Sequence, residues 1–161
     1  MDPSLRPPGE IRLRRAVADD AAALTAIAFS AKRSWGYPET WLHAWAAGLT
    51  ATPELIDGFP TFVALLDERI AGWSALRIQN TDAHLEHLWI DPPAMRRGLG
   101  RALFQHAESV ARAAGAHRLF ILSDPHAEPF YRRHGAHFLR HEPAPVNGTP
   151  RHLPLLLKPL R

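Results

Sequence analysis

The sequence predicts a mixed α/β fold, in which one sheet contains both antiparallel and parallel strand pairs. Two apolar segments, residues 61–66 and 70–79, flank the polar Asp67-Glu68 turn and predict an antiparallel hairpin. Residues 85–90 and 119–123 are also predicted strands, and an amphipathic helix is predicted between them. Because a strand, a helix and a strand in succession make a parallel crossover, we expect a mixed sheet.

The first part of the chain adds one strand and two helices. Residues 11–17 alternate between apolar and polar side chains, which is typical of a half-buried strand. Asp19 and Asp20 stand where carboxylates favour a helix start, and residues 22–31 continue that helix. An apolar stripe along residues 39–49 predicts a second helix.

The last part of the chain completes the predicted order. Apolar residues recur at helical spacing over residues 99–114, and Gly115 ends that crossover helix. A short helix is predicted at residues 127–134, followed by strands near residues 137–141 and 152–158. The expected order is therefore strand, two helices, three strands, helix, strand, helix and two strands.

The segment that joins residues 85–90 to the crossover helix has the composition of an anion site. Gly98 and Gly100 carry no Cβ, so a phosphate can approach the main-chain N–H groups that a helix start leaves unpaired. Neighbouring arginines add positive charge. The alternative interpretation is a tight turn with solvated arginines. The nucleotide-binding patterns G-x-x-x-x-G-K-[ST] and G-x-G-x-x-G do not occur here.

Two segments together resemble the GNAT superfamily of N-acetyltransferases. The first reads Met95-Arg96-Arg97-Gly98-Leu99-Gly100 and is similar to the family's [Q/R]-x-x-G-x-[G/A] signature, with Met95 at the leading position. The second, residues 124–136, is similar to Asn-x-x-Ala-x-x-Phe-Tyr-x-x-x-Gly-Phe, with Asp124 in place of Asn and Ala136 in place of the last Phe. The resemblance implies a GNAT-like fold from Ile11 onward, in which the central parallel strand pair splays apart.

The resemblance also implies where acetyl-CoA, the expected co-substrate, is bound. Its pantetheine arm is expected along the main chain of the fourth strand, and its pyrophosphate on the glycine turn. Asp124 is expected to bond the pantetheine or to cap the short helix. The expected cofactor-binding residues are Leu88, Trp89, Ile90, Met95, Arg96, Arg97, Gly98, Leu99, Gly100, Arg101, Asp124, Tyr131 and Arg133.

Two residues are candidates for the proton transfers of acetyl transfer. Tyr131 matches the family tyrosine that donates a proton to the departing sulfur, and a tyrosine stays protonated at neutral pH. Glu86, on the strand that leads to the glycine turn, could take the ammonium proton directly or through a water. The alternatives are a packed aromatic for Tyr131, and for Glu86 an exposed carboxylate paired with His84 or an arginine.

The acceptor site is expected under the loop between the first two helices. Trp35 and Tyr37 in this loop suit an acceptor with apolar or cationic character, and His126 is a possible second base near the acceptor. The loop rings could equally cap the core. His84 and His87 have a spacing that can bind metal on a helix, but in a strand they are expected to point to opposite faces, so no metal is expected.

Bulk properties narrow the alternatives. The chain of 161 residues predicts one domain over residues 10–161 after a flexible lead-in at residues 1–9. The net charge of +3 raises the question of a nucleic-acid partner, but no recognition motif is present, so none is expected. The absence of cysteine excludes disulfides and a Cys-acyl intermediate and is typical of the cytoplasm. No apolar run is long enough for a membrane span.

The predicted function is direct acetyl transfer from acetyl-CoA to a primary amine of a small molecule or peptide. The alternative is a non-catalytic acyl-CoA-binding sensor or interaction module. A third hypothesis is that the chain is a basic nucleic-acid-binding protein. A homodimer is left open, and so is the identity of the amine.

Overall fold

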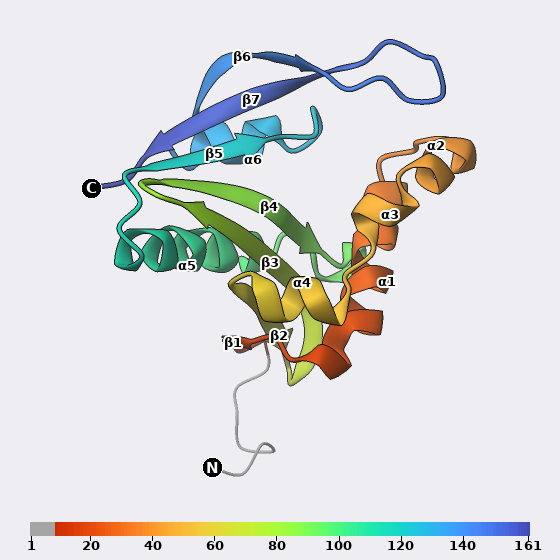
Figure 1. Ribbon diagram of the computed structural model, residues 1–161. Coiled ribbons are helices and arrows are strands. Elements are labelled where there is room, and N and C mark those ends of the chain that lie inside the picture. Colours follow the sequence, from red (N-terminus) through yellow and green to blue (C-terminus); the bar gives the residue numbers. More distant parts are fainter. Residues whose placement is uncertain (1–8) are drawn as a thin grey trace.

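The computed structural model describes residues 9–161, which form a seven-stranded mixed sheet with helices on both faces (Figure 1). The strands are β1 (Ile11–Arg15), β2 (Thr61–Leu66), β3 (Arg69–Gln79), β4 (Asp82–Ile90), β5 (Arg118–Leu122), β6 (His137–Pro143) and β7 (His152–Pro159). The helices are α1 (Ala21–Arg33), α2 (Glu39–Ala44), α3 (Ala46–Leu49), α4 (Pro53–Gly58), α5 (Leu99–Ala113) and α6 (Glu128–Arg133), with 3-10 turns η2 (Ala18–Asp20) and η3 (Pro92–Ala94).

The strand order is β1-β2-β3-β4-β5-β7-β6, and it confirms the predicted mixed sheet. β4 and β5 pair in parallel, whereas the other neighbouring strands pair antiparallel. The last strand in sequence, β7, therefore lies between β5 and β6. Every predicted strand is present, so the predicted order of strands is confirmed.

Two helical features differ from the prediction. The predicted helix at residues 39–49 is divided at Trp45 into α2 and α3. Helix α4 was not predicted, although its start carries a local signal. The Thr52 hydroxyl caps it by accepting a hydrogen bond from the Leu55 N–H at 3.1 Å, and Pro53 occupies its first turn.

The predicted lead-in at residues 1–9 lies outside the described residues, except for Gly9. The Gly9 N–H donates a hydrogen bond to the Asp67 carboxylate at 2.8 Å. Within residues 9–161, no helix combines the length and the apolar character needed to cross a membrane.

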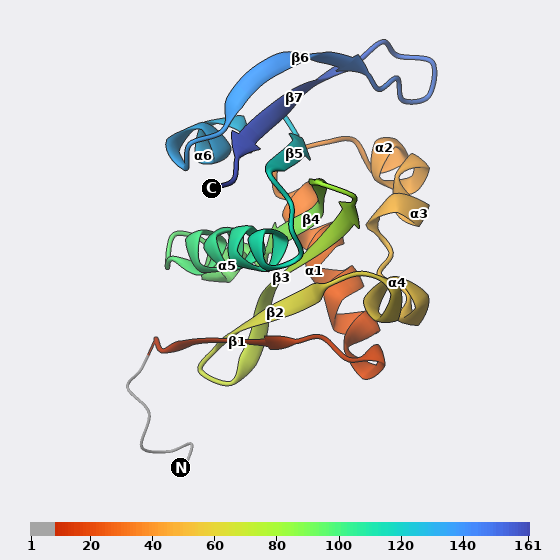
Figure 2. The same cartoon turned by 60° about the vertical axis from the view of Figure 1, so that its left-hand side comes forward.

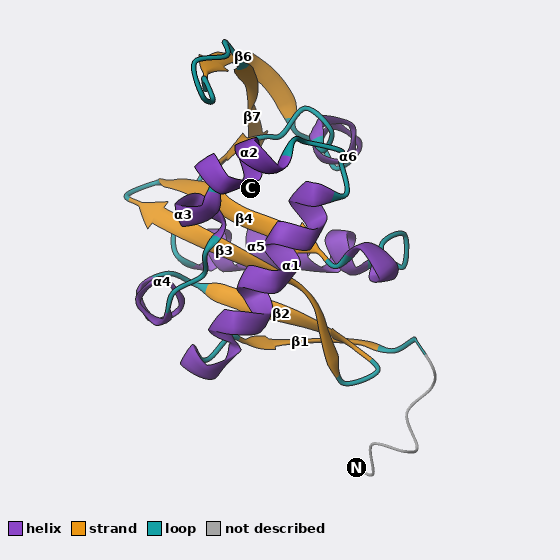
Figure 3. Cartoon of the chain, turned by 90° about the vertical axis from the view of Figure 1, so that its right-hand side faces the viewer, coloured by secondary structure: helices purple, strands orange, loops and turns teal. Residues whose placement is uncertain are grey.

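The sheet has a hydrophobic core on each face. On one face, Phe104 of α5 is fully buried with Leu76 and Ala83 of the sheet. On the other, α1 crosses the strands, and the Trp73 indole N–H donates to the Leu24 carbonyl of α1 at 2.9 Å (Figure 3). Each fully buried leucine or phenylalanine contributes about 1.5–3 kcal/mol to stability. The two cores pack against both faces of β4. The C-terminal half of β4, which includes Leu88, Trp89 and Ile90, lines the candidate site.

The central parallel pair is joined only at its beginning. Pairing runs from Asp82 with Arg118 to His84 with Phe120, and beyond it β4 has no partner on its β5 side among the described strands. Figures 1 and 2 show β5 turning away with β6 and β7. The Arg118–Asp82 ion pair, at 2.9 Å, lies at the joined end. This is the predicted splay, and it leaves main-chain groups of β4 open to a ligand.

β4 carries a bulge at Glu86. Two steps along β4, from Leu85 to His87, correspond to one step along β3, so Glu86 is an extra residue. The strict alternation expected for a strand is interrupted there. The rings of His84 and His87 consequently lie on the same face, opposite α5, and the prediction of opposite faces was wrong. Among residues 9–161, no group of three metal-ligating side chains is arranged to hold a metal.

Candidate active site

A cavity of about 340 Å³ lies between the far half of β4 and the starts of α5 and α6. Its lining residues are Ala31, Trp35, Leu88, Trp89, Ile90, Ala94, Met95, Arg96, Gly98, Leu99, Gly100, Arg101, His126, Ala127, Phe130, Tyr131 and Arg133. These include every predicted cofactor-binding residue except Arg97 and Asp124. The structure also brings Trp35 and His126 to this cavity, whereas Tyr37 does not line it.

Unpaired main-chain donors lie at one end of the cavity. The N–H groups of residues 96–101 have no acceptor within residues 9–161, and the first helical hydrogen bond of α5 is donated by Ala102 to the Gly98 carbonyl. Gly98 precedes the helix with a φ of +89°, a left-handed conformation that glycine adopts without strain. Such a helix start favours an anion.

Gly100 is required by packing as well as by access. A Cβ at this position would lie 3.3 Å from the Phe130 ring of α6 and 3.8 Å from an Ile90 side-chain carbon. α5 and α6 therefore approach each other closely at the cavity wall. The absence of a side chain at Gly100 both permits this approach and leaves the neighbouring N–H groups uncovered.

Three arginines give the same end of the cavity a positive charge. Arg96, Arg101 and Arg133 line it, whereas Arg97 is exposed and does not. Guanidinium groups form strong charge-assisted hydrogen bonds with phosphate. The free N–H groups and these arginines fit the phosphates of a CoA thioester, and the apolar wall of β4 fits its pantetheine arm.

Tyr131 is buried beside the apolar part of the cavity. Its ring packs against Phe104 and Phe130, with centroid distances of 5.6 and 5.2 Å. Its hydroxyl has no hydrogen-bond partner within the described part of the chain. Burial raises the pKa of Tyr131 well above its ordinary value, and the charge of Asp124 raises that pKa further. The hydroxyl therefore stays protonated and is free to donate to a ligand.

Asp124 lies outside the cavity lining, at the centre of a buried ionic cluster. Its carboxylate accepts hydrogen bonds from Lys32 at 2.8 Å, Tyr37 at 2.9 Å and Arg151 at 3.2 Å. Burial alone would raise the pKa of Asp124, but the hydrogen bond and charge of Lys32 and the N–H of His126 outweigh it. The pKa of Asp124 is lowered to about 2. Asp124 does not cap α6, since Ala127 is the N-cap residue and no side chain caps the helix.

The same cluster occupies the aromatic rings expected to receive a cationic acceptor. The Lys32 ammonium lies 4.3 Å from the Trp45 ring centroid, and the Arg151 guanidinium lies 5.1 Å from that of Tyr37. The Tyr37 hydroxyl also accepts a hydrogen bond from Arg151 at 2.6 Å. The Trp35 ring also lies 5.7 Å from the Lys32 ammonium, but unlike Tyr37 it lines the cavity, where its centroid lies 6.2 Å from that of Trp89. Sequence reasoning missed Lys32 and Arg151, because no local pattern links them to Asp124.

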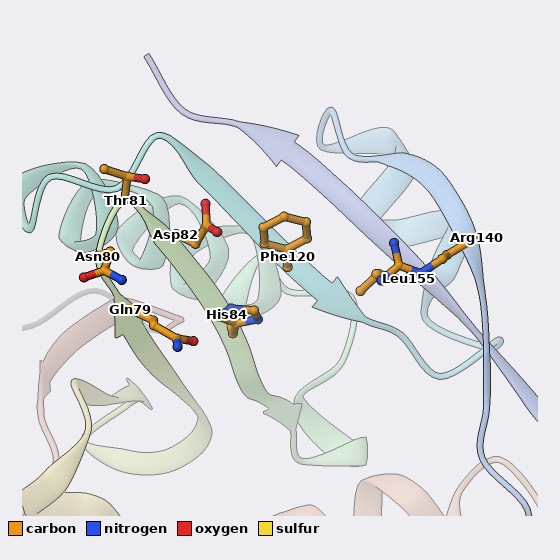
Figure 4. Close-up of a pocket in the computed structure, with 8 residues that line it drawn as sticks. All are labelled: Gln79, Asn80, Thr81, Asp82, His84, Phe120, Arg140 and Leu155. Carbon is orange, nitrogen blue, oxygen red and sulfur yellow. The ribbon is translucent and has the colours of Figure 1, made fainter.

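Glu86 faces a separate groove between β4, β5 and β7, here called the β4–β5 groove. It consists of two adjoining hollows of about 500 and 480 Å³, which share His84, Phe120 and Leu155. Figure 4 shows these three side chains in the first hollow. Glu86 lines the second hollow and forms an ion pair with Arg77 at 2.9 Å. Glu86 and Tyr131 therefore line different cavities, both bordered by β4.

Comparison of the sequence with models of protein families identifies the family of this protein. Residues 22–136 match the model of the acetyltransferase (GNAT) family. This is more than half of the chain, and it includes the helix start, the splayed strands and Tyr131. The protein belongs to the GNAT acetyltransferase family. It is an acetyl-CoA-dependent N-acetyltransferase.

Solved structures share the fold of this acetyltransferase. A GCN5-related N-acetyltransferase from Rhodopseudomonas palustris is 22% identical, with a TM-score of 0.79 over 97% of this chain and 98% of that one. The PaiA N-acetyltransferase from Thermoplasma acidophilum, solved with coenzyme A, is 17% identical, with a TM-score of 0.74 over 93% of this chain and 99% of that one. The ribosomal-protein-S18-alanine N-acetyltransferase from Escherichia coli is 18% identical (TM-score 0.70, 94% of each chain). No curated protein sequence matches the chain.

Replacing Asp124 by asparagine is expected to destabilise this acetyltransferase by about 3 kcal/mol, because two buried cations lose their carboxylate. In the wild type, this carboxylate gives its full stabilisation above its unfolded-state pKa of about 3.9 and loses it as the pH falls through about 2. Urea unfolding of both proteins across this acid range measures the difference.

The matched control is Asp82→Asn, which breaks the more exposed pair with Arg118. It should cost less than about 1 kcal/mol. Equal losses in the two variants would show that the Asp124 cluster has no special role in stability.

Proposed function

We propose that this acetyltransferase moves the acetyl group of acetyl-CoA, bound in the 340 Å³ cavity, directly to a primary amine of a small molecule or peptide. One observation carries the proposal. The cavity joins the free N–H groups of Arg96 and of residues 98–101, with three arginines, at one end to the unpartnered hydroxyl of Tyr131. When the CoA phosphates are bound at the first end, the thioester end of the molecule extends toward Tyr131.

Tyr131 and Glu86 act on different atoms in this proposal. Tyr131 donates its proton toward the thioester sulfur as the carbon–sulfur bond breaks. Glu86 takes one proton from the incoming ammonium in the β4–β5 groove, directly or through a water. Its pair with Arg77 does not oppose this role strongly, since both side chains are more than a third exposed and such pairs contribute less than about 1 kcal/mol.

The β4–β5 groove supports an amine with an apolar body as acceptor. Phe120, Leu122 and Leu155 provide apolar surface, and 51% of Leu122 is exposed. The carboxylates of Glu86 and Glu142 lie beside it, and each forms an ion pair with an arginine, Arg77 or Arg140, which an ammonium group would replace. An ammonium group attached to an aryl or alkyl chain fits this combination of apolar and acidic groups.

The test is a panel of amines: phenethylamine, lysine, spermidine and a peptide that begins with alanine. Release of free CoA thiol and formation of N-acetyl product are measured together for each. We expect phenethylamine to have the highest kcat/KM of the panel. Tight CoA binding without turnover of any amine would support the non-catalytic alternative. Salt-dependent DNA binding without CoA binding would support the nucleic-acid reading.

A further inference from the structure

His126 lines the cavity proposed for the thioester. It lines the same cavity as Tyr131, and its imidazole stacks on Trp35 with a centroid distance of 5.3 Å and an interplanar angle of 8°. The side chain is 45% exposed, so it is open to a ligand in the cavity. The proposed function so far gives His126 no chemical role.

The Asp124 cluster fixes which nitrogen of His126 carries the proton. Nδ1 lies 2.9 Å from one oxygen of the Asp124 carboxylate, and the His126 main-chain N–H donates to the same oxygen at 2.8 Å. An ionised carboxylate can only accept hydrogen bonds, so Nδ1 must be the donor. In the neutral ring, Nε2 is then left with a lone pair, and it has no partner within the described residues.

Tyr37 strengthens this assignment. Its hydroxyl lies 2.9 Å from the other Asp124 oxygen and 3.1 Å from Nδ1 of His126. Burial, together with the charge of Asp124, raises the pKa of Tyr37 to about 12, so the hydroxyl keeps its proton and donates it to the carboxylate. The Tyr37 oxygen then presents a lone pair to Nδ1, which agrees with a proton on Nδ1.

We propose that His126 is a second proton acceptor in acetyl transfer, with Asp124 and Tyr37 as positioning residues. This proposal rests on the proposed function and deepens it. An ammonium acceptor must lose two protons to become an amide. The first leaves before attack, toward Glu86. After the nitrogen–carbon bond forms, the nitrogen is positively charged, and its second proton passes to Nε2 of His126.

The remaining steps balance the reaction. The oxyanion collapses to the amide carbonyl, the carbon–sulfur bond breaks, and the sulfur receives a proton from Tyr131. His126 and Glu86 then release their protons to water, and Tyr131 regains one. One proton is released per acetylated ammonium. His126 is suited to the second step because its donor nitrogen is fixed on Asp124 and its acceptor nitrogen is free.

The kinetic test uses His126→Asn and the fastest amine of the panel. Asparagine can keep the hydrogen bond to Asp124 but has no basic nitrogen. We expect kcat to fall by about 10- to 10²-fold, because water remains as a slower proton acceptor, while KM for acetyl-CoA changes by less than about threefold. Added imidazole should restore part of the kcat of His126→Ala. The exposed His137→Ala is the control and should keep wild-type kinetics.

The pH profile separates a catalytic from a structural role. A proton acceptor in the reaction changes the shape of the pH profile, so the kcat/KM profiles of the wild type and His126→Asn should differ in shape, whereas a purely structural role would lower the whole profile equally. The charged and titratable groups around this ring are Asp124, Tyr37, Lys32 and Arg151 in the cluster, and Tyr131 and Arg133 in the cavity. Unchanged kcat in His126→Asn, or a loss that imidazole does not rescue, would overturn the proposal.

A spectroscopic measurement tests the geometry without any turnover. Nitrogen NMR of the labelled imidazoles should show the neutral His126 ring with its proton on Nδ1, and Asp124→Asn should weaken that preference. A proton on Nε2 in the wild type would refute the role of His126 even if acetyl transfer is confirmed. Absence of acetyl transfer in the wild type, with the proton on Nδ1, would instead refute the proposed function.

Discussion

Replacing Tyr131 by phenylalanine is expected to lower kcat by about 10²-fold or more, since the departing sulfur loses its proton donor. The ring keeps its contacts with Phe104 and Phe130, so the fold and the cavity should persist. The measurement is steady-state kinetics with a saturating amine and acetyl-CoA.

The control for this variant is its affinity for CoA, measured by calorimetric titration. Because this substitution removes only a hydroxyl group, the Kd for CoA should change by less than about threefold. A Tyr131→Phe variant that keeps wild-type kcat would show that solvent protonates the sulfur. A variant that loses CoA affinity and kcat equally would mark the hydroxyl as a binding group.

Replacing Arg101 by glutamate is expected to raise the Kd for CoA by about 10²-fold. One charge-assisted hydrogen bond to phosphate contributes about 1.5–3 kcal/mol, and the new carboxylate also repels the phosphate. The new carboxylate stands in the first turn of α5, where the helix dipole favours negative charge. Stability should therefore be kept, and a loss of affinity cannot be assigned to unfolding.

Arg97→Glu is the matched control, because it makes the same charge change beside the cavity but outside its lining. Its effect on Kd should be only a few-fold, since exposed charges are screened by salt. Equal effects of the two reversals would show that the phosphates do not sit at the start of α5.

Gly100→Val adds a steric version of the same test. The side chain should cover the free N–H groups and abolish CoA binding, and it also meets Phe130 at the contact described above. Its melting temperature must therefore be measured beside its CoA affinity. Loss of affinity in a folded Gly100→Val variant, together with the Arg101→Glu result, assigns the phosphates to this helix start.

Most of the fold could be predicted because its signals are local. The hairpin turn at Asp67 and Glu68 stands out between two apolar strands, and both residues adopt positive φ values of 51° and 67°. The start of α5 could be predicted from Gly98 and from the apolar residues that recur at helical spacing after it. The position of the cofactor cavity follows from the same segment, since a glycine turn that leads into a helix exposes N–H groups whatever the rest of the chain does.

The features that were missed depend on contacts between distant segments. Lys32 meets Asp124 across 92 positions, and no local pattern announces a buried ion pair. The bulge at Glu86 appears only when β4 is aligned with β3. The division of the second helix at Trp45 is likewise not visible in its apolar stripe, because that ring lies against Lys32 and Arg151 from other parts of the chain.

The measurement that tests the central claim most directly is a single-turnover reaction with radiolabelled acetyl-CoA, excess enzyme and the fastest amine of the panel. Direct transfer predicts that label passes from acetyl-CoA to the amine with equal release of thiol, and that quenched protein carries no label at any time. Labelled protein that forms before the N-acetyl product and decays into it would contradict direct transfer. Thiol release without N-acetyl product would contradict transfer to an amine altogether.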